Sequence, residues 1–139
     1  MILGLSHITF IVKDLQRASL FWRQIFDAQE VYDSGGQYFS LAREKFLTVG
    51  GIWICLMAGD PREERSYDHI AFQIAEEALE AYLSRIRQAG ADIKEARRRL
   101  AGEGRSVYFY DFDGHLFELH TGALAQRLEC YRQYCLPGQ

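Results

Sequence analysis

The sequence is poor in cysteine and proline and has no long apolar run. Only three cysteines and two prolines occur among its 139 residues. The odd number and irregular spacing of Cys55, Cys130 and Cys135 argue against a disulfide framework or a zinc knuckle, so we expect reduced thiols in a cytoplasm. The most apolar run, residues 49–59, is too short to cross a bilayer. The first ten residues have no basic segment and no small-residue cleavage site, so we expect no secretion signal.

The sequence also has no large excess of charge of either sign, with 16 basic residues (Lys and Arg) and 19 acidic ones. The formal net charge of −3 gives no reason to expect a nucleic-acid partner. The composition, 48% hydrophobic and 25% charged, is that of an ordinary globular protein, and the length suits one domain or two very small ones.

The chain contains an internal repeat. "SHITFIV" (6–12) and "DHIAFQI" (68–74) align with each other and alternate as strands do, which puts His7 and His69 at equivalent positions. Each is followed by a helical pattern, over 14–26 and 76–90. Such a repeat is typical of two copies of one supersecondary unit, neither of which can bury its sheet face alone.

Each helical pattern leads into further strand patterns. We expect strands over 28–34, 37–42, 44–57, 91–96, 106–112 and 115–120, with a tight turn at Asp113-Gly114 and a helix over 123–134. The predicted fold class is α+β, built from two tandem β-α-β-β-β modules. The predicted boundaries are a first module over 1–59, a linker over 60–68, a second module over 69–122, and a C-terminal helix and tail over 123–139.

Three side chains from separate strands could form a metal site. Two imidazoles, His7 and His69, and the carboxylate of Glu118 match a common catalytic pattern that leaves coordination positions open. Histidines on strands are more often ordinary core or edge residues, and a shared strand motif could persist for packing alone. His120 shares a strand face with Glu118 and could be a further ligand, but we expect it in solvent at the strand end, and we expect His115 to bond backbone in the turn.

The twin strands and the hairpin "YFYDFDGHLFELH" resemble the vicinal oxygen chelate superfamily, which includes glyoxalase and bleomycin-resistance proteins. Together with "GLSHITFIVKDL", "GIWICLM" and "GEGRS", they more closely resemble the water-adding type of fosfomycin-resistance enzyme, up to about Tyr131. The resemblance implies a cup-shaped mixed sheet and a divalent metal, Mn²⁺ or alternatively Fe²⁺, held by His7, His69 and Glu118. It also implies a homodimer in which His7 meets His69 and Glu118 of the partner subunit.

The resemblance further implies that water opens the epoxide of fosfomycin or a related small phosphonate, with Glu44 as general base. From the residues alone, an acid between Arg43 and Lys45 is typical of a solvated surface charge. The implied substrate-binding residues are Thr9, Trp53, Arg98, Ser106, Tyr108 and Arg127. One departure is Gly102, where thiol-transferring relatives have a serine.

Other functions remain open at this point. Within the family, glutathione or bacillithiol could replace water as the nucleophile. A metal-free, drug-sequestering protein of the bleomycin-binding type is an alternative of another class. Glyoxalase I and extradiol dioxygenase chemistry are less well supported, because "GIWICLM" offers no fourth metal ligand and dioxygenases usually have more modules. No membrane partner is expected.

Overall fold

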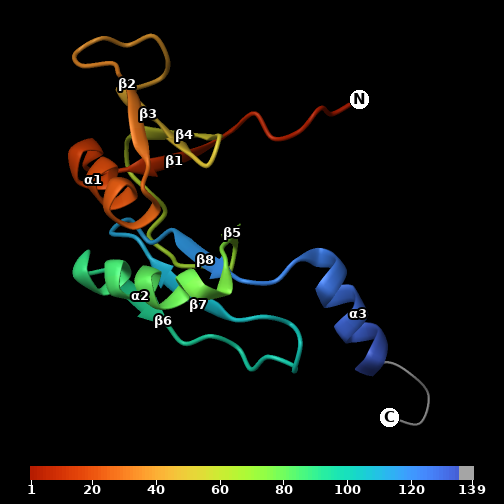
Figure 1. The fold of residues 1–139 in the computed structure, drawn as a ribbon. Coiled ribbons are helices and arrows are strands. Elements are labelled where there is room, and N and C mark those ends of the chain that lie inside the picture. The colour runs from red at the N-terminus through yellow and green to blue at the C-terminus, as the bar shows by residue number, and fades with distance from the viewer. Residues whose placement is uncertain (135–139) are drawn as a thin grey trace. The chain divides into compact units, whose positions relative to one another are not determined.

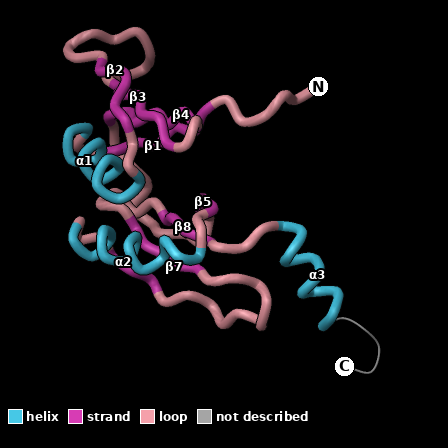
Figure 2. The backbone as a smooth tube through the Cα atoms, in the orientation of Figure 1, coloured by secondary structure: helices cyan, strands magenta, loops and turns pink. Residues whose placement is uncertain are grey.

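The computed structural model describes residues 1–134, which form two compact units (Figures 1 and 2). Unit 1 comprises Met1–Arg65 with Asp111–His115, and unit 2 comprises Ser66–Tyr110 with the chain from Leu116 onward. Cys135 and the rest of the predicted tail lie outside the described residues. No helix within the described part of the chain is long and apolar enough to cross a bilayer.

Unit 1 contains a four-stranded mixed sheet and one helix. In chain order these are β1 (His7–Val12), α1 (Leu15–Phe26), β2 (Gln29–Asp33), β3 (Glu44–Val49) and β4 (Ile52–Ala58). The strand order is β1-β4-β3-β2, with β1 parallel to β4 and the other pairs antiparallel. Because side chains alternate along a strand, one face of the sheet is apolar and buried with α1, and includes Val12, Leu47, Ile54 and Leu56.

Unit 2 repeats this arrangement. Its elements are β5 (His69–Gln73), a 3₁₀ turn (Glu76–Ala78), α2 (Leu79–Gln88), β6 (Asp92–Lys94), β7 (Ser106–Tyr110), β8 (Leu116–His120) and α3 (Leu124–Tyr134). The strand order β5-β8-β7-β6, with β5 parallel to β8, has the topology of the first sheet. The predicted α+β class with two tandem β-α-β-β-β modules is therefore confirmed.

Two strand predictions in unit 1 are wrong. The stretch 44–57 is a hairpin of two strands, because Gly50 and Gly51, with φ of 53° and 80°, form its turn. The stretch 37–42 is a loop with an exposed apolar tip. The loop is closed at its base by Ser34, whose N–H donates to the Glu44 carbonyl and whose Oγ accepts from the Glu44 N–H.

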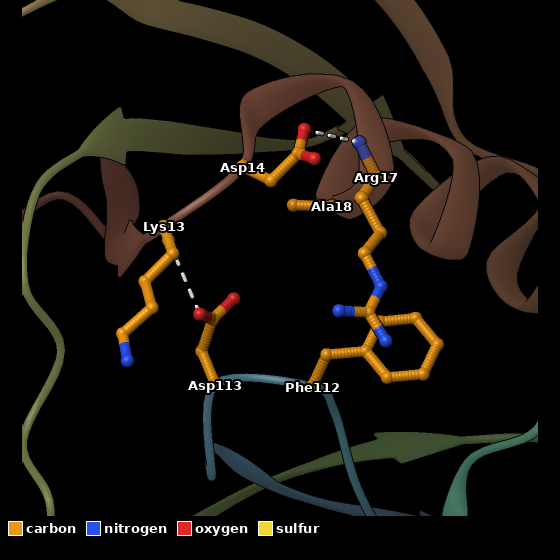
Figure 3. Close-up of a pocket in the computed structure, with 6 residues that line it drawn as sticks. All are labelled: Lys13, Asp14, Arg17, Ala18, Phe112 and Asp113. Carbon is orange, nitrogen blue, oxygen red and sulfur yellow. Dashed lines mark hydrogen bonds between the residues drawn. The ribbon is translucent and has the colours of Figure 1, made fainter.

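The tip of the β7–β8 hairpin, residues 111–115, belongs to unit 1. Figure 3 shows Phe112 and Asp113 of this tip beside Lys13 and Arg17. The Asp113 carboxylate accepts the Lys13 N–H at 3.1 Å, and the Arg17 guanidinium lies 3.7 Å from the centre of the Phe112 ring. The cavity beside these residues measures about 60 Å³. Pockets for drug-sized ligands are typically larger, on the order of 300–1,000 Å³, so this cavity is too small for such a ligand.

Candidate metal and substrate site

One face of the sheet in unit 2 carries His69, Ser106, Tyr108, Glu118 and His120, and we call it the polar face. Strand register places Tyr108 opposite Glu118, and Ser106 opposite His120, while His69 at the start of β5 projects from the same face. The opposite face is apolar and carries Phe109, Phe117 and Leu119, which are at most 1% exposed. Alternation along three short strands is therefore what gathers these polar groups.

Glu118 is only 4% exposed and is fully paired. One carboxylate oxygen accepts from Ser106 Oγ at 2.6 Å and from Arg99 Nη2 at 2.7 Å, while the other lies 3.0 Å from His69 Nε2. Burial by itself raises the pKa of Glu118, but hydrogen bonds from Ser106 and Tyr108 and the charge of Arg99 outweigh it. The net result is a pKa below the usual value, so the group is a carboxylate.

The orientation of His69 suits a metal ligand. Its Nδ1 lies 2.6 Å from the Tyr67 carbonyl oxygen, which can only accept, so Nδ1 carries the proton. In the neutral ring, Nε2 then presents a lone pair to a carboxylate oxygen of Glu118 at 3.0 Å. A proton on Nε2 would make this contact a hydrogen-bonded ion pair, and a metal ion that binds both atoms would also bring them to about this separation. The pair fits a divalent metal.

The third predicted ligand lies in unit 1. His7 is exposed, its Nδ1 lies 3.0 Å from Ser6 Oγ, and its ring packs against that of Trp53 with centres 4.2 Å apart. Within residues 1–134 no three His, Cys, Asp or Glu side chains are grouped as a metal site requires. The described residues thus bring together two of the three predicted ligands, both in unit 2.

Glu44 is buried rather than solvated, so its interpretation as a surface charge is wrong. It is 8% exposed at the start of β3, and its carboxylate lies 3.5 Å from Cys55 Sγ. Burial, then the charge and hydrogen bond of Glu44, raise the pKa of the Cys55 thiol to about 11. Register places Glu44 on the same sheet face as His7, Thr9 and Cys55. This face of unit 1 therefore combines a buried carboxylate with a predicted metal ligand.

An arginine that the sequence did not single out reaches the polar face. Arg99 Nη2 lies 2.7 Å from Ser106 Oγ and 2.9 Å from the Tyr108 hydroxyl, in addition to its contact with Glu118. Its Nε and Nη1 are buried and have no hydrogen-bond partner among the described residues. The neighbouring Arg98, which the family resemblance favoured, is exposed. Three consecutive arginines in an irregular segment carry no periodicity that tells which one points inward.

His120 is 8% exposed, so the expectation that it lies in solvent is wrong. Its Nδ1 lies 2.7 Å from Ser106 Oγ, and its Nε2 lies 3.1 Å from Arg127 Nη2 on α3. Burial and the charges of Arg127 and Arg99 lower the pKa of His120, which keeps the ring neutral. Register could have found it, since a side chain two residues after Glu118 lies on the same face of β8.

Two further predicted polar residues, Tyr108 and His115, differ in their surroundings. Burial, then a hydrogen bond with Tyr67 and the charge of Glu118, raise the pKa of Tyr108, so its hydroxyl keeps its proton. His115 lies in unit 1, where its Nδ1 is 2.7 Å from the Asp111 carboxylate rather than bonded to backbone. Its contacts are those of a residue that stabilises the hairpin tip.

Comparison with known proteins first defines the class. The sequence model of the Glyoxalase/Bleomycin resistance protein/Dioxygenase superfamily matches residues 4–119, and the two repeated modules of the fold agree with it. The chain belongs to this superfamily.

More specific relatives are fosfomycin resistance proteins, which confirms the resemblance seen in the sequence. FosX of Listeria monocytogenes is 56% identical over 133 residues, covering 96% of this chain and all of that protein. A crystal structure of a variant of that FosX, complexed with Mn(II) and 1S,2S-dihydroxypropylphosphonic acid, has a TM-score of 0.87 and 54% identity, covering 94% of this chain and 99% of that one. Metallothiol transferase FosB of Shouchella clausii is 42% identical over 96% of this chain and 90% of that protein.

Proposed function

We propose that this protein is a Mn²⁺-dependent fosfomycin resistance enzyme that opens the epoxide of fosfomycin by adding water. The observation that carries the proposal is the polar face of unit 2. There, His69 and Glu118, a pair that suits a metal, lie beside Arg99, whose buried Nε and Nη1 form no hydrogen bond among the described residues. A metal and a phosphonate are the two things that an enzyme acting on fosfomycin must hold.

His7, His69 and Glu118 would hold the metal, with His7 joining His69 and Glu118 of the partner subunit in a homodimer. When bound, Mn²⁺ supplies Lewis acidity for the developing negative charge on the epoxide oxygen. The Tyr67 carbonyl holds a proton on His69 Nδ1 and so leaves Nε2 for a metal, while the lowered pKa of Glu118 keeps its carboxylate charged, as metal ligation needs. A mixed imidazole and carboxylate set suits Mn²⁺.

Arg99, Ser106, Tyr108 and Arg127 are the proposed phosphonate donors on or beside the polar face. A buried guanidinium N–H without an acceptor is costly, and an anionic oxygen would supply that acceptor. The Tyr108 hydroxyl and the Ser106 hydroxyl add neutral donors within 2.9 Å of Arg99 Nη2. The family resemblance adds Thr9, Trp53 and Arg98 to the proposed substrate contacts.

Glu44 is the proposed general base. As a water oxygen bonds to an epoxide carbon, Glu44 takes a proton from that water while the ring C–O bond breaks. The ring oxygen then takes a proton from solvent and Glu44 releases its own to solvent, which leaves a dihydroxypropylphosphonate and restores the base. The ligand in the crystal structure of the FosX variant is such a diol. The burial of Glu44, with Cys55 as its neighbour, keeps the carboxylate out of bulk water.

Thiol transfer is the second candidate, because the chain is also 42% identical to a metallothiol transferase. The two reactions are separated by mass spectrometry of the product formed in ¹⁸O-labelled water, with and without glutathione or bacillithiol. Hydration gives a diol with one ¹⁸O atom whether or not thiol is present. A thioether adduct as the main product would replace hydration with thiol transfer. We expect the reaction to take place in the cytoplasm.

A further inference from the structure

A second buried carboxylate in unit 2, Glu103, has no part in the proposed chemistry. It is 0% exposed, in the irregular segment between β6 and β7. One oxygen accepts from Arg97 Nη2 at 2.6 Å and from the Tyr131 hydroxyl at 2.8 Å, and the other accepts the Leu100 N–H at 2.7 Å. These donors, Arg97 first, lower the pKa of Glu103 to about 2 despite its burial.

Glu103 lies next to both arginines that reach the polar face. Its Oε1 is 3.8 Å from Arg99 Nη1 and 4.0 Å from Arg127 Nε. The Nη2 atoms of the same two arginines point elsewhere, to Glu118 and to His120. Each guanidinium therefore has one edge towards Glu103 and another towards the polar face. The two longer distances exceed hydrogen-bond length, so Glu103 balances the charge without using up their donors.

The backbone of Glu103 is held as tightly as its side chain. A Cβ built on Gly122 would lie 2.6 Å from the Glu103 carbonyl oxygen, and one built on Gly104 would lie 2.9 Å from the Gly122 nitrogen. Gly104, with φ of 93°, adopts a conformation that side chains disfavour. This close approach fixes Glu103 against the turn between β8 and α3.

Helix α3 is bound to the same segment by other contacts. Gln126 Nε2 donates to the Gly102 carbonyl at 2.9 Å, and the Cys130 thiol donates to the Ala101 carbonyl at 3.1 Å. Tyr131 completes the set through its bond to Glu103. The segment that carries Arg99 and the helix that carries Arg127 thus meet at one carboxylate.

We infer that Glu103 is a positioning residue for phosphonate recognition: it is the shared counter-ion that orients Arg99 and Arg127 so that the edges turned away from Glu103 face the anion. Bidentate binding of a phosphonate depends on guanidinium orientation, and a fixed counter-ion on the far edge supplies that orientation. This inference rests on the proposed function and adds to it the residue that arranges the anion donors.

The test compares Glu103→Gln with wild type in the Mn²⁺-loaded protein. The change keeps the shape but removes the charge, so we expect KM for fosfomycin to rise about tenfold, the effect of one charge-assisted hydrogen bond. We expect kcat and the Mn²⁺ dissociation constant to change little. Calorimetry with methylphosphonate, on metal-free protein, should show a matching loss of affinity. Tyr131→Phe, which removes a single hydrogen bond to Glu103, should raise KM less but in the same direction.

Glu129→Gln is the matched control, because Glu129 forms an exposed ion pair with Arg132 on the same helix and should leave KM unchanged. An unchanged KM and methylphosphonate affinity in folded Glu103→Gln would overturn the inference. So would parallel losses in kcat, Mn²⁺ affinity and melting temperature. If Glu103→Gln does not fold, an unchanged KM in Tyr131→Phe overturns it. If the wild-type protein does not turn over fosfomycin, the proposed function fails, but the methylphosphonate affinities still decide the role of Glu103. If the wild-type protein binds no methylphosphonate, the inference about Glu103 is overturned.

Discussion

Replacing each of two neighbouring arginines tests which one binds the phosphonate. Arg99 has buried Nε and Nη1 groups without hydrogen-bond partners among the described residues, whereas Arg98 is exposed. Loss of one charge-assisted hydrogen bond costs about 1.5–3 kcal/mol. That cost corresponds to a rise of roughly 10- to 100-fold in a dissociation constant. We therefore expect Arg99→Met to raise KM for fosfomycin by that factor and Arg98→Met to leave it nearly unchanged.

The same pair of variants separates phosphonate binding from metal binding. Arg99 Nη2 lies 2.7 Å from the Glu118 carboxylate, so removing this cation leaves the carboxylate more available to a metal. We expect Arg99→Met to bind Mn²⁺ at least as tightly as wild type in calorimetry, while fosfomycin kinetics show the rise in KM. A normal KM in Arg99→Met with a raised KM in Arg98→Met would contradict this assignment and return the role to Arg98.

Three further results are expected. Glu44→Gln should lower kcat for hydration about 100-fold or more, with Mn²⁺ affinity retained; full turnover in steady-state assays would remove Glu44 from the mechanism. Co-refolding inactive His7→Ala and Glu118→Ala chains should restore roughly a quarter of wild-type activity, because half of the dimers are mixed and each mixed dimer has one intact site of two. If no activity returns, His7 joins His69 and Glu118 of its own chain. Because the pKa of Glu103 is lowered to about 2, its contribution to stability is present above the unfolded value near 4.5 and is lost as pH falls towards 2. Urea titrations over this pH range should show a smaller loss of unfolding free energy in Glu103→Gln than in wild type. An equal loss in both proteins would mean that Glu103 is not the source of the pH dependence.

The repeated sheets could be predicted because their evidence is local. His7 and His69 occupy equivalent places in alternating stretches, and period-2 alternation alone indicates which side chains share a face. The strand predictions over 37–42 and 44–57 failed, because alternation of apolar and polar residues does not show where a strand ends. Gly50 and Gly51 divide one apolar stretch into two strands, and the strand predicted over 37–42 is a loop.

The polar face was only partly predictable. Ser106, Tyr108 and Glu118 follow from strand register, since alternate residues on paired strands meet on one face. Arg99 and Glu103 lie in an irregular segment, where no period relates sequence position to direction. The burial of Glu103 depends on α3 and on the close approach at Gly122, which are contacts distant in sequence.

The order of residues along the chain was enough to establish the repeated module, the strand positions of His7, His69 and Glu118, and the resemblance to fosfomycin-resistance enzymes. Periodicity and motif spacing are properties of neighbouring residues, so they can be read along the chain. The folded chain was needed to show that Arg99 rather than Arg98 reaches Glu118, that Glu44 is buried, and that Glu103 lies between two arginines. Those facts depend on which segments pack together, because burial and ion pairing are set by neighbours in space.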